Sequence, residues 1–458
     1  MLFTTVAGCA LAMCLSAARA ETLMEAMILA YQNNPTLQAQ RASLRATDEG
    51  VPQALAGWRP FVEIVGDGGY LAESGDGIDG TDSGGTYSGS LRVTQNVYAG
   101  GGTVADVNRA EDTVRAERAR LSSIEQTVLL NAVQAYMNVV RDEAVLRLNL
   151  NNERVLGRQL EATRDRFNVG EVTRTDVSQA EARVSSATAD RIQAEGDVQI
   201  SRGIYEQIIG KLPDAVQKPE AVVDLPNSRQ ESVQVALEGN PDVLAALYDE
   251  RASVSNVKVQ TSDLLPRVDV VGQGGRTGNE VGSSTSRDSG SIIAQLTVPL
   301  YQRGFATSRV REAKQVVGRN RMRLIEARRG ATEDANNAWE TLVTARARIR
   351  SFTAAVRANR IALEGVRQEA LVGSRTVLDV LDAEQELLDS QVNLVRAERD
   401  ETVAQYQLKS AIGRLTAQSM SLNTEYYDPN QHYDKVRDKL WGLGGDLDKP
   451  GAQPPETK

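Results

Sequence analysis

Apolar positions recur every seventh residue in two long segments that contain no proline. Proline is absent from Phe61 to Leu212 and from Leu300 to Asp428. A seven-residue spacing keeps one stripe of a helix turned toward a partner helix and predicts coiled-coil packing. We therefore predict long helices at 102–168 and 304–371, each about 100 Å long. The two stripes consist of Val107, Val114, Leu121, Val128 and Ala135, and of Val310, Val317, Leu324, Ala331, Ala338, Ala345 and Phe352.

A second helix is predicted after each long one, at 174–212 and 376–415, once the chain has turned at Gly170 or Gly373. Small side chains along the seams of these helices allow their backbones to approach closely. An isolated two-stranded coiled coil, which is the simpler alternative, would favour larger seam residues. The seam positions alternate spacings of three and four: Val177, Ala180, Val184 and Ala187, then Val380, Ala383, Leu387 and Ser390.

Outside the helical segments the pattern changes to alternation, which is typical of membrane β-strands. Alternating segments run over 61–71, 87–97, 267–276 and 291–300, and loops rich in Gly, Ser and Asp join them into hairpins 61–97 and 267–300. Four strands leave open edges, so we expect the membrane sheet to be shared between chains. Tyrosines stand near the expected strand ends, as in an interfacial aromatic girdle: Tyr70, Tyr87, Tyr98 and Tyr301.

The chain repeats itself. Asn34-Pro35 recurs as Asn240-Pro241, and Val169-Gly170 recurs as Val372-Gly373. We interpret residues 21–212 as a first repeat with short helices near 22–56, residues 213–228 as a linker, and residues 229–415 as a second repeat with short helices near 229–262. Residues 416–458 form a polar C-terminal flank and tail.

Residues 1–20 have the features of a secretory signal peptide. They contain no acidic residue, are apolar from Val6 to Ala17, and end in an Ala-x-Ala sequence before Glu21. Cys9 could alternatively mark a lipoprotein cleavage site. Because Cys9 and Cys14 both lie in this segment, the mature chain has no cysteine for a disulfide, a thiolate metal site or a nucleophile.

Charge and hydropathy narrow the class of protein further. The mature chain has 51 basic and 61 acidic residues, a formal net charge of −10, which argues against nucleic acid as a partner. Beyond residue 20 no run of 18 apolar residues suggests a membrane-spanning helix.

Three motifs that resemble sites of chemistry have simpler explanations. Gly75 to Gly80 matches a dinucleotide-binding pattern, but it lies in a predicted hairpin loop without the required strand and helix. Asp76, Asp79 and Asp82 are better explained as a solvated acidic loop than as a cation site. His432 has no recognisable triad or metal-ligand context. We expect no enzyme, no cofactor and no metal.

The two helix-to-helix turns carry the most informative residues. Asp379 and Asp382 are three residues apart, so they share one face of a helix just past its start. Carboxylates also suit the positive end of a helix dipole, which is the structural alternative. Tight turns at Gly170 and Gly373 would expose backbone and a small apolar residue, as expected of a docking surface. We assign docking to Val169, Gly170, Glu171, Val372, Gly373 and Ser374.

Over residues 21–415 the chain resembles the TolC family of outer-membrane channels. The resemblance lies in Glu21-Thr22-Leu23, the Asn-Pro pairs, the sequence Arg-Phe-Asn-Val-Gly at 166–170 and the run from Val372 to Ala383. It implies a homotrimer with a 12-stranded β-barrel in the outer membrane and a 12-helix coiled-coil tunnel that extends into the periplasm. The fold class is thus an α + β membrane protein with an internal duplication.

The same resemblance implies the parts of a gate. Asp379 and Asp382 would line the periplasmic aperture, and contacts from Arg375 to Thr175 and Asp176 would hold it shut. A tyrosine of the family's gate is replaced by Ala370 here, and the extra cation Arg174 is a candidate substitute.

The function expected is passive export of proteins, small toxic compounds or both to the cell exterior. A periplasmic adaptor protein and an inner-membrane transporter, either ABC-type or proton-driven, would supply the energy, and outer-membrane lipid would surround the strands. The alternative is a trimeric periplasmic coiled-coil or adhesin-like protein that conducts nothing.

Overall fold

The computed structural model describes residues 21–73, 82–219, 224–281 and 285–443. The predicted signal peptide, the Gly75–Gly80 motif with Asp76 and Asp79, and the tail beyond residue 443 lie outside this part. The chain forms two compact units. One comprises Met1–Gln38, Ser122–Asn240 and Ala331–Tyr426, and the other Ala39–Leu121, Pro241–Gly330 and Tyr427–Lys458.

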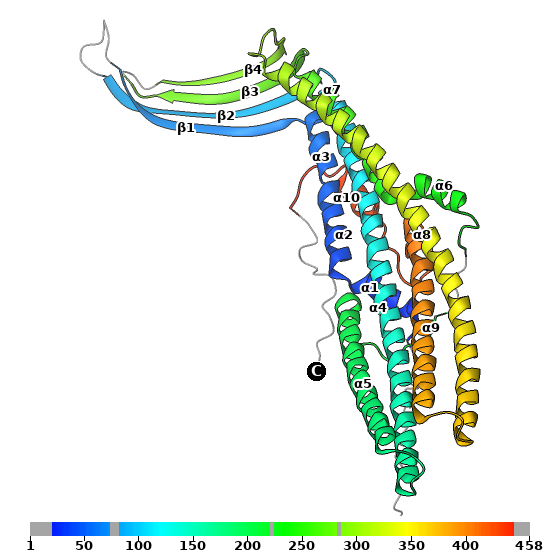
Figure 1. Ribbon diagram of the computed structural model, residues 1–458. Coiled ribbons are helices and arrows are strands. Elements are labelled where there is room, and N and C mark those ends of the chain that lie inside the picture. Colours follow the sequence, from blue (N-terminus) through cyan, green and yellow to red (C-terminus); the bar gives the residue numbers. More distant parts are fainter. Residues whose placement is uncertain (1–20, 74–81, 220–223, 282–284, 444–458) are drawn as a thin grey trace, which may run out of the picture. The chain divides into compact units, whose positions relative to one another are not determined.

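Four antiparallel strands form one sheet in the order β1-β2-β3-β4 (Figure 1). They are β1 (Phe61–Glu73), β2 (Asp82–Ala99), β3 (Arg267–Asn279) and β4 (Thr285–Thr297). The two predicted hairpins are therefore present, and the pairing of β2 with β3 joins them. The ladders extend farther toward the loops than the alternation suggested, with Asn279 opposite Thr285. β4 ends at Thr297 rather than at Leu300, two residues before Pro299, which has no N–H to pair.

The strand register separates the side chains onto two unlike faces. One, here called the apolar face, carries no charged residue except Arg276 and Asp288, which pair at 2.6 Å. The other, the polar face, carries the Glu63–Arg92 ion pair at 3.4 Å and the Asn96–Asp269 hydrogen bond at 2.9 Å. The apolar face includes Val62, Ile64, Tyr70, Tyr87, Leu91, Val93, Val268, Val270, Ile292 and Leu296.

The predicted helix pairs are α4 (Gly102–Asn168) with α5 (Arg174–Ile209), and α8 (Phe305–Leu371) with α9 (Val377–Ala411). Heptad residues Val114, Leu121, Val128 and Ala135 of α4 are buried. α5 ends at Ile209, three residues before the expected end, because Gly210 adopts a left-handed conformation with φ +94°. α9 likewise ends at Ala411, before Gly413 at φ +78°.

Short elements complete the described chain. They are α1 (Leu23–Asn33), α2 (Pro35–Asp48), α3 (Gly50–Leu55), the 3₁₀ helix η1 (Ala56–Trp58), α6 (Arg229–Gly239), α7 (Pro241–Ser262) and α10 (Gln431–Val436).

The repeated Asn-Pro pairs have a structural explanation in these short elements. The Asn34 side-chain amide donates to the Ile208 carbonyl near the end of α5, at 3.1 Å. The Asn240 amide donates to the Ala411 carbonyl at the end of α9, at 3.2 Å. Each bond satisfies a carbonyl that a helix terminus leaves without an intrahelical partner.

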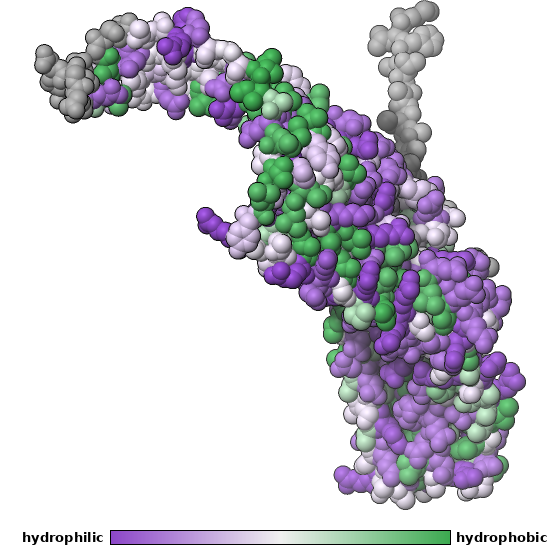
Figure 2. Space-filling view, turned by 90° about the horizontal axis from the view of Figure 1, so that it is seen from above, coloured by the Kyte–Doolittle hydropathy of each residue, from purple (hydrophilic) through white to green (hydrophobic). Residues whose placement is uncertain are grey.

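In the described chain, none of the helices combines the length and the apolar character needed to cross a bilayer. Figure 2 shows hydrophilic residues over much of the helical surface in view, with hydrophobic residues in separate patches.

Candidate gate and docking tips

Two helix-to-helix turns, here called the tips, have the same backbone geometry. At the first tip the Gly170 N–H donates to the Phe167 carbonyl at 2.9 Å and the Glu171 N–H to the Arg166 carbonyl at 2.9 Å. At the second, the Gly373 and Ser374 N–H groups make the equivalent bonds to Ala370 and Glu369, at 3.2 and 3.0 Å. This is the Schellman pattern of a helix end, and it requires the positive φ of Gly170 (+80°) and Gly373 (+79°).

Apolar side chains project from both tips and are largely exposed in the single chain. Val169 is 72% exposed, and Leu371 and Val372 are 78% and 80% exposed. Among the described residues other than the adjacent ones, no atom lies within 4 Å of a Cβ built on Gly170 or Gly373. The tips therefore offer an open, partly apolar surface.

Each tip is followed by a capping box that uses a predicted site residue. At the start of α9, the Thr376 N–H and hydroxyl both donate to Asp379 Oδ2 at 2.8 Å, and the Asp379 N–H donates to the Thr376 hydroxyl at 3.2 Å. Thr173 and Asp176 make the same set of bonds at the start of α5. Asp379 and Asp176 thus have the same local role in the two repeats. Each accepts hydrogen bonds at a helix start, where N–H groups lack intrahelical partners.

Asp379 remains ionised. Hydrogen bonds from the Thr376 backbone N–H and then from its hydroxyl lower the pKa of this carboxyl below its ordinary value of 3.8, and Arg375 adds a smaller effect in the same direction. Thr175, at the corresponding turn of α5, is exposed.

Asp382 pairs across helices with a cation that the sequence analysis did not identify. Arg183 of α5 donates to Asp382 Oδ1 of α9. One signal could have found it, because the two repeats differ here in complementary ways: Arg183 corresponds to Glu386 in the second repeat, and Asp382 to Gln179 in the first. The ion pair can therefore form where Arg183 of the first repeat faces Asp382 of the second, whereas the equivalent positions Glu386 and Gln179 cannot form it.

Arg375 is engaged within its own tip. Its Nε donates to Glu369 Oε2 at 2.9 Å, whereas Asp176 accepts from Thr173. The single chain therefore does not bring the predicted gate residues Arg375 and Asp176 together in any of its described hydrogen bonds or ion pairs. At the first tip the charges are reversed, since Arg166 near the end of α4 pairs with Glu171 of the turn at 3.1 Å.

A small apolar cluster fixes α5 and α9 side by side near the tips. Its buried members are Leu156 of α4, Ala180 and Ala187 of α5, and Val377 and Leu381 of α9. The predicted seam alanines are thus in contact with the neighbouring repeat, and their small size permits the Arg183–Asp382 pair to span the two helices.

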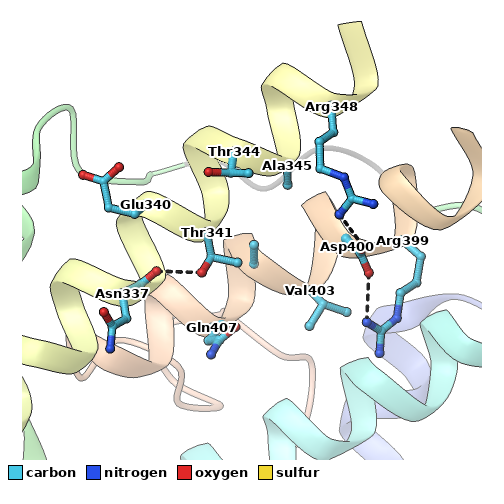
Figure 3. Close-up of a pocket in the computed structure, with 11 residues that line it drawn as sticks. Asn337, Glu340, Thr341, Thr344, Ala345, Arg348, Arg399, Asp400, Val403 and Gln407 are labelled. Atoms are coloured by element: carbon cyan, nitrogen blue, oxygen red, sulfur yellow. Dashed lines mark hydrogen bonds and ion pairs between the residues drawn. The ribbon is translucent and has the colours of Figure 1, made fainter. Parts of the chain in front are cut away.

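A groove of about 490 Å³ lies between α8 and α9, away from the tips (Figure 3). Its charged residues are already paired: Asp400 accepts from Arg348 at 3.3 Å and from Arg399 at 3.2 Å. Among the described residues, no group of three or more His, Cys, Asp or Glu side chains could hold a metal ion. The groove is lined by both polar and apolar side chains of α8 and α9.

Comparisons with known proteins agree with this geometry. The sequence model of the family described as "Outer membrane efflux protein" matches residues 27–211 and 232–414, once for each repeat. The chain is 35% identical over 428 residues to the outer membrane efflux protein BepC of Brucella suis biovar 1 (strain 1330), covering 93% of each chain. It is 28% identical over 415 residues to the outer membrane protein TolC of Vibrio cholerae serotype O1, covering 88% of this chain and 93% of that one.

A solved structure of the outer-membrane channel OprN has the same fold, with a TM-score of 0.76 at 21% identity, covering 85% of this chain and 89% of that one. The family model and the relatives, together with the paired long helices and the two-faced sheet, define a non-enzymatic transport protein. The chain belongs to the outer membrane efflux protein family. It is a TolC-type channel of the outer membrane that extends into the periplasm, and channels of this family form trimers.

Proposed function

We propose that three copies of this chain form one export duct, with Asp379 and Asp382 at its periplasmic aperture. The observation that carries the proposal is the position of the two carboxylates, one turn apart at the start of α9 and directly after the second tip. Around a threefold axis they would form a ring of six carboxylates, the usual arrangement of a cation-selective constriction.

We further propose that ion pairs set the width of this aperture. Arg375 would exchange Glu369 for Thr175 and Asp176 of a neighbouring chain when the duct closes. Its present partner Glu369 is exposed, and exposed ion pairs are weak because water and salt screen them, so such an exchange costs little. The Arg183–Asp382 pair, which ties α5 to α9, would take over the contribution of the tyrosine that Ala370 replaces.

Conductance of the reconstituted duct tests the aperture. Asp379→Asn combined with Asp382→Asn should weaken block by a multivalent cation by roughly tenfold or more, since the loss of about 1.4 kcal/mol already gives tenfold. Asparagine is preferable to alanine at position 379 because its side-chain oxygen can still accept from the Thr376 N–H in the capping box of α9. Arg375→Ala and Arg183→Ala should each raise conductance and keep the block.

Asp389→Asn is the matched control for this experiment. It removes a carboxylate from the same helix, about 15 Å farther along, where Gln385 donates to Asp389 at 2.9 Å. The constriction would lie elsewhere if the double Asp379 and Asp382 variant were blocked as tightly as the parent. The same would follow if Asp389→Asn weakened the block equally.

We propose that the tips are the docking surface of a periplasmic adaptor, which links the duct to an ABC-type or proton-driven transporter of the inner membrane. Support comes from the exposure of Val169 and Val372, and from the open space around a Cβ built on Gly170 or Gly373 among the described residues. Because BepC is described as an efflux protein, small toxic compounds are the cargo we favour. Deletion of the gene, followed by measurement of both drug susceptibility and the secreted proteome, distinguishes small compounds from secreted proteins as the cargo.

Val169→Asp with Val372→Asp tests docking without altering the glycine backbone. The added charges should leave trimer assembly intact and abolish export, because a carboxylate opposes burial in an apolar contact. Val104→Asp serves as the control, since that valine is also exposed but lies at the start of α4. Normal export by the tip variant would show that the adaptor binds another surface.

A further inference from the structure

The C-terminal flank is fixed along one unit by a series of polar contacts. Tyr427 lies under the Arg41 guanidinium at 5.0 Å, and Tyr433 under that of Arg118 at 5.1 Å. His432 Nδ1 lies 3.2 Å from the buried Asp48 carboxylate. These contacts hold the flank against α2 and the first part of α4.

The flank ends beside the base of the sheet. Arg59, two residues before β1, donates from Nη1 to the Lys439 carbonyl at 2.8 Å. The neighbouring Trp58 carbonyl accepts from Gln95, whose side chain shares the apolar face with Val270. Residues 58 and 439 are thus both located where the apolar face begins.

This base is the periplasmic end of the sheet. β1 follows α3 and η1, and β2 leads through Gly100 and Gly101 into α4. Because the helices of this channel extend into the periplasm, the strand ends that join them lie at the periplasmic surface of the outer membrane. The hairpin loops are at the opposite ends.

Three large apolar side chains follow Lys439 and are exposed. Leu440 is 75% exposed, Trp441 is 89% exposed, and Leu443 is fully exposed. They come directly after a segment that the contacts above hold in place. Adjacent exposed apolar residues of this size are characteristic of a surface that contacts a membrane or another protein.

We propose that Leu440, Trp441 and Leu443 form a foot that inserts into the periplasmic leaflet of the outer membrane and binds phospholipid. The Arg59–Lys439 hydrogen bond places the start of the foot at the periplasmic end of the sheet. A tryptophan is suited to this level because its ring is apolar while its N–H can face water or headgroups. Arg59 supplies a cationic group at the same end of the sheet, complementary to lipid phosphates.

Tryptophan fluorescence in vesicles tests the foot directly. The protein has three tryptophans, so Trp58→Phe with Trp339→Phe leaves Trp441 as the sole emitter in the full chain. The variant is reconstituted into phosphatidylcholine and phosphatidylglycerol vesicles whose acyl chains carry bromine either near the headgroup or near the methyl end. Emission should be blue-shifted, and bromine near the headgroup should quench it more than bromine near the methyl end.

A second variant provides the matched control. Trp58→Phe with Trp441→Phe leaves only Trp339, which packs against the cluster around Ala338 and Leu408 in the helical unit, and bromine at either depth should leave its emission unchanged. Leu440→Ser with Leu443→Ser in the sole-Trp441 protein should reduce the quenching.

Three results would overturn the proposal. Unquenched red-shifted emission from Trp441 means that the foot is in water, and unquenched blue-shifted emission means that it packs against a neighbouring chain. Stronger quenching by bromine near the methyl end means that the side chain lies deep in the bilayer. None of these outcomes depends on the aperture, so the foot and the proposed gate fail or succeed separately.

Discussion

At the scale of single residues, the same side chain can serve local folding and function. Asp379 and Asp176 complete the capping boxes at the starts of α9 and α5 through matching threonine contacts, and the fold alone would explain why carboxylates stand there. The sequence showed that both residues lie at helix starts. It could not show that Arg375 pairs with Glu369, because a long flexible side chain has several acceptors in range and only the folded geometry selects one. The Arg183–Asp382 pair left a trace in the sequence, since the two repeats differ at these positions, but that difference alone does not place the two side chains in contact.

Lys409 provides a residue-scale prediction about pH. It is buried near the end of α9, where its Nζ lies 3.7 Å from the Met420 sulfur, and burial lowers its pKa below the ordinary 10.5. The folded chain then holds this proton less tightly than the unfolded chain, so stability should rise as pH increases between the lowered pKa and 10.5. Lys409→Met should therefore stabilise the protein at neutral pH, on the order of 1 kcal/mol.

Hydrogen exchange at the end of α9 measures this effect. The advantage of Lys409→Met over the parent should be largest near neutrality and should disappear as the pH approaches 10.5. An exposed lysine, Lys435→Met in α10, is the control and should change little. A destabilised Lys409→Met protein at neutral pH would mean that the ammonium has a favourable partner.

At the scale of elements, prediction succeeded where a physical period repeats. The seven-residue stripes identified α4 and α8, because such a stripe is useful only on a continuous helix. Strand limits were less accurate: alternation in β2 and β4 fades among Gly, Ser and Asp, although the backbone ladder continues to Asp82 and Thr285. Backbone pairing does not require apolar side chains, so the hydrophobic pattern underestimates it.

The repeated asparagines give an element-scale prediction. Asn34→Ala and Asn240→Ala should each destabilise the end of the helix they cap, α5 or α9, by about 1 kcal/mol, because a partly buried carbonyl loses its donor. Hydrogen exchange localised to 204–209 and 406–411 would measure the two losses. Asn33→Ala is the control, since Asn33 is exposed beside Asn34. Unequal losses at Asn34 and Asn240 would contradict equivalent roles in the two repeats.

At the scale of the whole molecule, the open edges of the sheet are the feature that requires several chains to assemble. β1 and β4 each pair with one neighbour in the chain, and in lipid an unpaired strand edge is costly. We predict a trimer that survives mild detergent, with β4 of each chain paired to β1 of the next in a closed sheet. Size measurement of the purified complex checks it, and a stable monomer in the same detergent would contradict the architecture.

The equivalence of the two hairpins has a consequence for symmetry. If β4 joins β1 of the next chain as β2 joins β3 within one chain, then six similar hairpins alternate around a pseudo-sixfold ring. Six identical copies of one ancestral repeat could build the same ring, but every seam between them would carry the same residues. Duplication within one chain removes this constraint, because Arg183 can face Asp382 at alternate seams while Gln179 and Glu386 occupy the others. Fusion of two repeats therefore permits an ion pair at every second interface between repeats. A homo-oligomer of six identical repeats could not have such alternating interfaces.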